Sequence, residues 1–400
     1  MAIFNPFLPS FLENPYPAYA SLRRSDPVHF SAALQAWVLT RYDDCERVLR
    51  DPTTFSSSAE RATGQLAQTL LQQRRQFPLG EVPTVLNSDP PTHTRLRALV
   101  NRAFTPHTVE DLRPHIEEIA GSLLAEARSG QPFDLVTGFA QPLPIIVIAE
   151  LLGVPSSDRD LFKRWSNAIA ATTNVLNPPP VLEAAREATA ELVAYLDRVV
   201  AERRQSLADD LISALVRVED GGERLSHEEL LAFSILLLLA GNETTTNLIG
   251  NGMLALAANP EQAARIRSDA ACLPGAVEEL LRYDSPVQGV VRFTTARAEV
   301  GGREIEAGAT VLAMVAAANR DPARFPDPDR LDVTREDNRH LSFGRGIHFC
   351  LGAPLARLEG EVAFGALLRR FPRLEVAAPG ARRQGTLALR GLASLPLAVD

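Results

Sequence analysis

The densest run of hydrophobic residues covers positions 230–240 and is interrupted only by a serine. Just before it, Ser226 is followed three residues later by Glu229, a spacing typical of the capping box that begins a helix. Because apolar residues continue on several faces of the helical pattern, we predict one long, mostly buried helix from about 227 to 257. Helix-favouring residues extend well beyond this segment, and they predict a helical block from about 90 to 285.

Strand-like patterns lie before and after this block. They are rich in β-branched and aromatic residues and fall near 25–45, 285–320 and 375–400. Within the second of these, Gly301 and Gly302 lie between apolar runs and predict a hairpin. A further helical segment is predicted over 353–370. Since no linker divides the chain, we expect a single domain over residues 1–400, mainly α with smaller β-sheets, an α+β fold.

Composition and charge narrow the class of protein. The chain carries 41 basic and 49 acidic residues, a formal net charge of −8, which argues against a general nucleic-acid binder. Its three cysteines, Cys45, Cys272 and Cys350, form no C-x-x-C pair, so a zinc ribbon or a disulfide scaffold is not expected. No secretory signal is visible, and the run at 230–240 is too short to span a bilayer. We expect a soluble, cytoplasmic protein.

The segment from Phe343 to Gly352 is the most specific local sequence. It places three glycines and Cys350 within ten residues, directly before a predicted helix. Amide groups at a helix start can hold such a cysteine as thiolate, which serves as a nucleophile or a metal ligand. Taken alone, a cysteine is more often a small buried residue. A dinucleotide-binding loop is excluded because its third glycine is missing and no clean strand precedes it.

Polar residues interrupt the long predicted helix at 240–245, which reads Ala-Gly-Asn-Glu-Thr-Thr. A glycine and a threonine that bonds back to the preceding turn both favour a local bend. Further along, Glu279 and Arg282 are three residues apart and share one helix face. Alone, each feature has an ordinary structural explanation, a helix bend and a surface ion pair.

Taken together, these motifs make the chain resemble the cytochrome P450 family. The cysteine segment matches every specified position of that family's Phe-Gly-x-Gly-x-His-x-Cys-x-Gly loop. Three further motifs follow the family's order and spacing, namely His93/Arg97, Glu243/Thr244 and Glu279/Arg282. The resemblance implies the P450 fold, a helix-rich triangular prism with haem between a long distal helix and the proximal cysteine loop.

The resemblance also implies a cofactor and a set of site residues. The cofactor is haem b, iron protoporphyrin IX, with the Cys350 thiolate as axial ligand of its iron. Glu243 and Thr244 are implied to be catalytic, delivering protons and a hydrogen bond during oxygen activation. The haem propionates are implied to bind four basic side chains, which are His93, Arg97, Arg292 and His348.

By the same resemblance, the substrate occupies a pocket over the distal face of the haem. The positions that correspond to its walls are nearly all apolar: Val85, Leu86, Val175, Leu176, Leu236, Leu237, Ala240, Val287, Val290 and Leu392. A pocket of this kind favours a hydrophobic small molecule. Some of these residues are equally consistent with ordinary core packing.

The predicted function is a monooxygenase that inserts one atom of O2 into a fatty acid, terpenoid, steroid or polyketide-like substrate. Electrons are expected from a separate ferredoxin or flavodoxin with its reductase, and no membrane anchor or nucleic acid is expected. A peroxygenase, a haem or lipid carrier and a cysteine hydrolase are the alternatives. The Glu243–Thr244 pair speaks against the first two, and a haem-containing protein would exclude the third.

Overall fold

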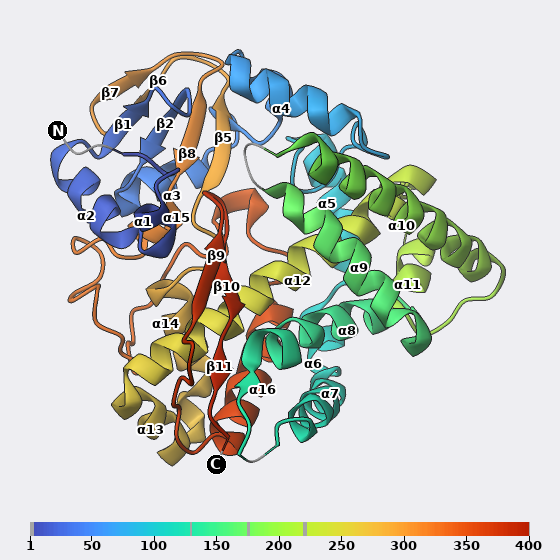
Figure 1. Cartoon of the computed structure of the whole chain (residues 1–400). Coiled ribbons are helices and arrows are strands. Elements are labelled where there is room, and N and C mark those ends of the chain that lie inside the picture. Colours follow the sequence, from blue (N-terminus) through green and yellow to red (C-terminus); the bar gives the residue numbers. More distant parts are fainter. Residues whose placement is uncertain (1–3, 129, 174–176, 219–221, 400) are drawn as a thin grey trace.

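The structure is a computed structural model, and it describes residues 4–128, 130–173, 177–218 and 222–399. Figure 1 shows a large helical part beside a smaller β-part, in which strands from both ends of the chain lie together. This arrangement confirms the predicted α+β fold with helices in the majority. Among the helices of the described residues, none combines the length and hydropathy needed to cross a bilayer.

The helices lie throughout the chain. Their bounds are α1 (Pro9–Glu13), α2 (Tyr16–Ser25), α3 (Tyr42–Arg50), α4 (Gln65–Arg75), α5 (Thr92–Ala103), α6 (Pro106–Glu110), α7 (Arg113–Ala125), α8 (Pro142–Leu151), α9 (Arg159–Ala170), α10 (Pro179–Gln205), α11 (Leu211–Arg217), α12 (His227–Ala258), α13 (Pro260–Ser268), α14 (Leu273–Tyr283), α15 (Val315–Ala318) and α16 (Ala353–Arg370). Short 3₁₀ turns and a π-helical turn at Val136–Ala140 connect some of them.

Within the part of the chain that the structure describes, the strands form one five-stranded sheet and three two-stranded ribbons. Their bounds are β1 (Val28–Ser31), β2 (Ala36–Leu39), β3 (Phe55–Ser56), β4 (Phe133–Asp134), β5 (Val290–Thr294), β6 (Ala298–Val300), β7 (Arg303–Ile305), β8 (Thr310–Ala313), β9 (Arg382–Gly385), β10 (Arg390–Ser394) and β11 (Pro396–Leu397). The large sheet has the order β1-β2-β8-β5-β3, and only β2 and β8 run parallel. The predicted hairpin at Gly301 and Gly302 is the turn between β6 and β7.

Helix α12 runs through the centre of the helical part (Figure 1). The Ser226 side chain accepts a hydrogen bond from the Glu229 amide, and the Glu229 carboxylate accepts one from the Ser226 amide, which confirms the predicted capping box. From there the helix continues to Ala258, one residue beyond the predicted end, and most of its residues are buried. Helices α8, α9, α10, α14 and α16 pack around it.

Gly252 of α12 lies against the Phe364 ring of α16. A Cβ at this position would lie 2.5 Å from the Phe364 ring of α16, closer than two carbon atoms can pack. The small residue thus lets the central helix lie directly against the helix that follows the cysteine loop.

Two features differ from the expected pattern. Helices α1 to α4 lie before residue 90, where no helix was predicted, and β4 lies inside the predicted helical block, where it pairs with β11 near the other end of the chain. Two residues are too few to show the alternating pattern of a strand. The extended conformation of β4 depends instead on its pairing with a distant strand, which the local sequence does not reveal.

Candidate active site

The loop before α16 is held in shape by two glycines and one backbone hydrogen bond. Gly344 and Gly346 have φ values of +69° and +71°, which side chains other than glycine rarely adopt. A Cβ on Gly346 would also lie 2.6 Å from the Leu49 carbonyl oxygen. The Cys350 amide donates to the Phe343 carbonyl oxygen at 2.9 Å and closes the loop. Cys350 is therefore presented just before the first turn of α16.

The environment of the Cys350 sulfur acts on its charge in two opposing ways. Solvent reaches the side chain, yet the protein atoms crowded around the sulfur raise the pKa of the thiol. The amides of Gly352 and Ala353 hydrogen-bond to it and, with the nearby cations Arg97 and Arg357, act to lower that pKa. A further positive partner, such as a metal ion, would complete the stabilisation of a thiolate here.

The four basic residues predicted to bind propionates lie together. His93 and Arg97 come from α5, Arg292 from β5 and His348 from the cysteine loop, and electrostatic interactions connect them. The rings of His93 and His348 are 4.3 Å apart between centroids. The structure thus gathers side chains that are more than 250 residues apart in the sequence.

Three of these side chains have fewer hydrogen-bond or ion-pair partners among the described residues than their polar groups can bind. His93 is 2% exposed, and its Nε2 atom has no hydrogen-bond partner within the described residues. Arg97 forms no ion pair with any described carboxylate, and it is close enough to Cys350 for their charges to interact. Burial lowers the pKa of Arg292 to about 10, and its guanidinium donates to the Val291 carbonyl oxygen. An anion with several acceptor atoms fits this cluster, as haem propionates would.

His348 differs from the other three because both of its ring nitrogens have partners. Nδ1 lies 3.1 Å from the Val85 carbonyl oxygen and therefore carries the proton, while Nε2 lies 2.9 Å from the Ser57 hydroxyl. Burial and the charge of Arg292 lower the pKa of His348 to about 4, so the ring is neutral at pH 7. A propionate at His348 would have to share or replace the Ser57 hydroxyl.

An acidic residue that the sequence analysis did not single out lies beside this cluster. The Asp89 carboxylate accepts hydrogen bonds from the Ser57 amide at 2.9 Å and from the Ser56 hydroxyl. Its charge also acts on Arg292 and on His93. In the sequence, Asp89 is marked only by its position just before Pro90 and the start of α5. Its hydrogen bonds depend on the chain at β3, and the sequence analysis did not predict that strand.

Glu243 and Thr244 lie near the middle of α12. The Thr244 hydroxyl donates to the Ala240 carbonyl oxygen at 2.7 Å, the bond to the preceding turn that the sequence predicted. Glu243 is half-buried, and burial raises the pKa of its carboxyl to about 7. A carboxyl with this pKa can both accept and release a proton near neutral pH.

Two further polar contacts anchor this part of α12, and sequence reasoning missed both. The Asn242 side chain donates to the Ser166 hydroxyl of α9 at 2.7 Å, and both residues are buried. Glu359 of α16 hydrogen-bonds to Thr245, and burial raises the pKa of its carboxyl to about 8. Nothing in the local sequence marks these residues, since each contact joins two helices distant in the chain.

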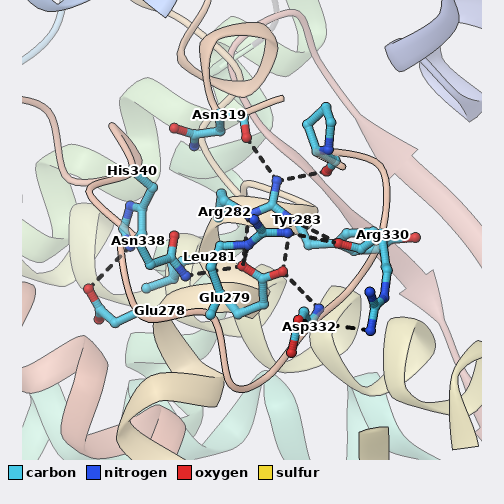
Figure 2. A network of polar contacts seen from close by, with 12 residues as sticks. Glu278, Glu279, Leu281, Arg282, Tyr283, Asn319, Arg330, Asp332, Asn338 and His340 are labelled. Atoms are coloured by element: carbon cyan, nitrogen blue, oxygen red, sulfur yellow. Dashed lines mark hydrogen bonds and ion pairs between the residues drawn. The ribbon is translucent and has the colours of Figure 1, made fainter. Parts of the chain in front are cut away.

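The Glu279–Arg282 pair is buried at the end of α14, and both side chains are 0% exposed (Figure 2). The guanidinium donates to both carboxylate oxygens, at 2.7 and 2.8 Å, and to the carbonyl oxygens of Asn319 and Pro328. Glu279 in turn accepts from the Asp332 amide at 2.9 Å. The pair thus fixes α14 to the segment that leads into the cysteine loop.

The residues predicted to line a substrate pocket do not share one environment. Val85 and Leu237 belong to the large core cluster and Leu236 packs against it, whereas Val287 and Val290 pack against the core beside the main sheet. Ala240 is exposed on α12, and Val175 and Leu176 lie outside the described residues.

Two of the predicted wall residues lie at the extremes of exposure. Leu86 is 64% exposed, because it occupies the loop between α4 and α5. Leu392 is 1% exposed and packs against Gly250 of α12, so a core role accounts for it in this structure. The pattern of apolar residues along the chain could not separate a wall from a core position.

The fold and the cysteine loop together define the haem-thiolate class of proteins. A family model for cytochrome P450 matches residues 33–380. The chain is 44% identical to cytochrome P450 107B1 of Saccharopolyspora erythraea, across 97% of this chain and 96% of that protein. It is also 44% identical to the vitamin D(3) 25-hydroxylase of Pseudonocardia autotrophica, across 98% of this chain and 95% of that protein.

A solved structure agrees with these relatives. The bacillaene polyketide synthase cytochrome P450 PksS of Bacillus subtilis superposes with a TM-score of 0.90 at 40% identity and covers 100% of both chains. The chain therefore belongs to the cytochrome P450 family. It is a monooxygenase that acts on hydrophobic small molecules, its family cofactor is haem iron, and it requires a redox partner.

Proposed function

We propose that residues 1–400 form one P450 domain that binds haem b through Cys350 and hydroxylates or epoxidises a lipophilic substrate of the steroid or polyketide class. The names of the vitamin D(3) hydroxylase and of the polyketide synthase P450 support these two classes. The proposal depends above all on one observation. The Cys350 sulfur, which would bind the iron, lies close enough to Arg97 for their charges to interact, and under-partnered basic side chains that would bind the propionates lie in the same site.

When bound, haem supplies the activation of dioxygen. The chain's own residues position the cofactor and manage protons. Cys350 would bind the iron through its sulfur, and Arg97, His93 and Arg292 would hold the propionates with charge-assisted hydrogen bonds. His348, whose nitrogens already have partners, contributes through Ser57 or in exchange for it.

Glu243 and Thr244 are assigned to proton delivery on the distal side. The Glu243 carboxyl, with its pKa raised to about 7, holds a proton in about half of the molecules at neutral pH. The Thr244 hydroxyl donates to the Ala240 carbonyl oxygen and is free to accept a hydrogen bond.

Electrons are proposed to come from a cytoplasmic ferredoxin or flavodoxin with its reductase. The test combines the purified holoprotein, a surrogate ferredoxin and reductase, NAD(P)H and a set of steroids and macrolide-type polyketides. Substrate-induced loss of the iron-bound water, followed by formation of a hydroxylated or epoxidised product, supports the proposal. Product formed only with peroxide, and never with the electron donors, would contradict it.

A further inference from the structure

The polar segment of α12 divides its residues between two faces of the helix. Ala240 is exposed, and Glu243 and Thr244 are half-buried, so the face at positions i, i+3 and i+4 is the accessible one. Asn242 and Thr246 lie on another face and are 4% and 8% exposed. The proposed function uses the accessible face and gives the two buried polar side chains no role.

Asn242 connects α12 to α9 through a side-chain hydrogen bond. Its Nδ2 atom donates to the Ser166 Oγ atom at 2.7 Å, and Ser166 is 1% exposed. A buried amide is destabilising when it has no partner, whereas a partnered one restricts how the two helices can pack. The bond therefore restrains both the distance between α12 and α9 and the rotation of α12 at this point.

Thr246, one turn further along the same face, connects α12 to the start of α8. Its hydroxyl donates to the Ala140 carbonyl oxygen at 3.0 Å and lies 3.4 Å from Asn242 Oδ1. In an α-helix the donor to that carbonyl would be the amide of residue 144, but this residue is a proline and has no N–H. The Thr246 hydroxyl supplies a donor in place of the one that Pro144 lacks, so α12 is held from two neighbouring elements.

Apolar packing alone defines the rotation of α12 weakly. The helix is buried over most of its length and its apolar residues occur all around it, so a small rotation exchanges one apolar surface for another. A buried polar contact removes this freedom, as a single buried asparagine does when it fixes the register of packed helices. Glu243 follows Asn242 by about 100° around the helix, so the same contact sets where the side chains of Glu243 and Thr244 point.

We propose that Asn242 is a positioning residue for the monooxygenase reaction. Its bond to Ser166, supported by the contact between α12 and the start of α8, sets the rotation of α12 that directs Glu243 and Thr244 toward the distal side of the haem. The inference rests on the proposed function, in which these two residues deliver protons. Asn242 acts through them and is not itself assigned a contact with substrate or cofactor.

The test compares four variants of the purified holoprotein with the unmodified protein. S166A and N242L each remove one partner of the bond, and the double variant S166A/N242L replaces both partners with apolar side chains. S234A is the matched control. Ser234 is buried on the same helix, but its hydroxyl donates within that helix, to the Leu230 carbonyl oxygen at 2.9 Å.

Urea unfolding shows whether the bond between α12 and α9 stabilises the protein. Each single change takes the partner from a buried polar group, so S166A and N242L should unfold at lower urea concentrations than S234A. The double variant leaves neither partner behind, and it should recover most of the loss because replacing both partners by apolar groups is nearly neutral. Single variants as stable as S234A would overturn the inference.

The yield of product per NAD(P)H separates positioning from stability. It is measured with the surrogate ferredoxin and reductase and with testosterone as the probe, or with the first steroid or macrolide that gives product if testosterone does not. The yield should fall about 2- to 10-fold in S166A and N242L, the equivalent of one neutral hydrogen bond, and should stay low in the double variant, which also lacks the bond. S234A should match the unmodified protein. With a purely structural bond the yield of the double variant would return together with its stability, and that result would overturn the inference.

Hydrogen exchange of the α12 amides keeps the test decisive if the double variant takes up no haem. Over residues 240–246, S166A should exchange faster than S234A, and equal exchange would overturn the inference. The outcomes also separate the two proposals. A holoprotein that forms no product from any of these compounds with the electron donors contradicts the proposed function, whereas undiminished yields in S166A and in the double variant contradict only this inference.

Discussion

The Glu359 carboxyl of α16 hydrogen-bonds to the Thr245 hydroxyl of α12, where the two helices pack against each other. Glu359 is 1% exposed, and its Oε1 atom has no hydrogen-bond partner within the described residues. A carboxylate in this position would be a buried, unpaired charge, which is why the pKa of Glu359 is raised to about 8. A protonated acid therefore lies next to the helix segment that carries Glu243 and Thr244.

Replacing Glu359 with glutamine should make stability less dependent on pH. The carboxyl ionises near pH 4.3 in the unfolded chain and near pH 8 in the folded one, so between these values only the folded state keeps the proton. The folded state accordingly loses stability as the pH rises through this window, by at most about 1.4 kcal/mol per pH unit. E359Q lacks this dependence, since its amide does not ionise.

Urea unfolding of both proteins at about pH 5, 7 and 9 measures the difference. We expect E359Q to gain stability relative to the unmodified protein as the pH rises toward 8, with no further gain above it. Parallel stability curves over the whole range would show that Glu359 is not protonated in the folded state.

Thr244→Ala should separate electron consumption from product formation. The variant should bind haem and substrate normally, but its product yield per NAD(P)H should fall about 10- to 100-fold, with the missing electrons recovered as hydrogen peroxide. Thr244→Ser is the control, because it keeps the hydroxyl and should restore most of the yield. Unchanged yield in Thr244→Ala would assign proton delivery to another group.

Ionisation of Glu243 should make the rate of product formation depend on pH. Because its pKa is raised to about 7, the balance between its protonated and ionised forms changes between about pH 6 and 8. Turnover should vary across this range in the unmodified protein and should be lower and nearly flat in Glu243→Gln. A variant with the same pH profile as the unmodified protein would exclude Glu243 from the proton path.

Arg97→Gln should weaken haem binding, because the cation is proposed to pair with a propionate. Loss of one charge-assisted hydrogen bond of this kind costs about 1.5–3 kcal/mol, or about 10- to 100-fold in affinity. Arg95 on the same helix provides the control, since it pairs with Glu229 of α12 and should not affect haem. Haem titration of the apoproteins compares the two, and equal affinities would remove Arg97 from the cofactor site.

Glu279→Gln should destabilise the protein severely. It leaves the Arg282 charge buried without its carboxylate, and breaking a buried pair in this way costs about 3–5 kcal/mol. Glu304→Gln removes one member of an exposed pair with Arg297 and should cost less than about 1 kcal/mol. Urea unfolding of both variants tests the contrast, and similar losses would mean that the buried network contributes little.

Elements with strong local signals could be predicted from the sequence. The capping box at Ser226 placed the start of α12, and the glycines before Cys350 placed the cysteine loop and the start of α16. The Glu279/Arg282 motif was identified from its place in the family's order, whereas the pair alone is equally consistent with a surface position. These features depend either on residues close together in the sequence or on a motif whose position in the family is known.

Features that depend on contacts between distant segments could not be predicted. Strand β4 exists because of β11, and the contacts of Asn242 and Glu359 require neighbours on α9 and α16. Arg95 pairs with Glu229 of the capping box at the start of α12, and nothing in the local sequence marks this contact. For the substrate pocket, an apolar residue fits a wall and a core equally well until its neighbours are known, as Leu392 shows.

The bond between Cys350 and the haem iron is tested most directly by the absorption spectrum of the reduced holoprotein under CO. The unmodified protein and the Cys272→Ala control should both show the absorption of a thiolate-ligated haem, because Cys272 lies away from the site at the start of α14. Cys350→Ala should lose that absorption while it retains its helical content. A thiolate spectrum that persists in Cys350→Ala, or that is absent from the haem-supplied unmodified protein, would contradict the account.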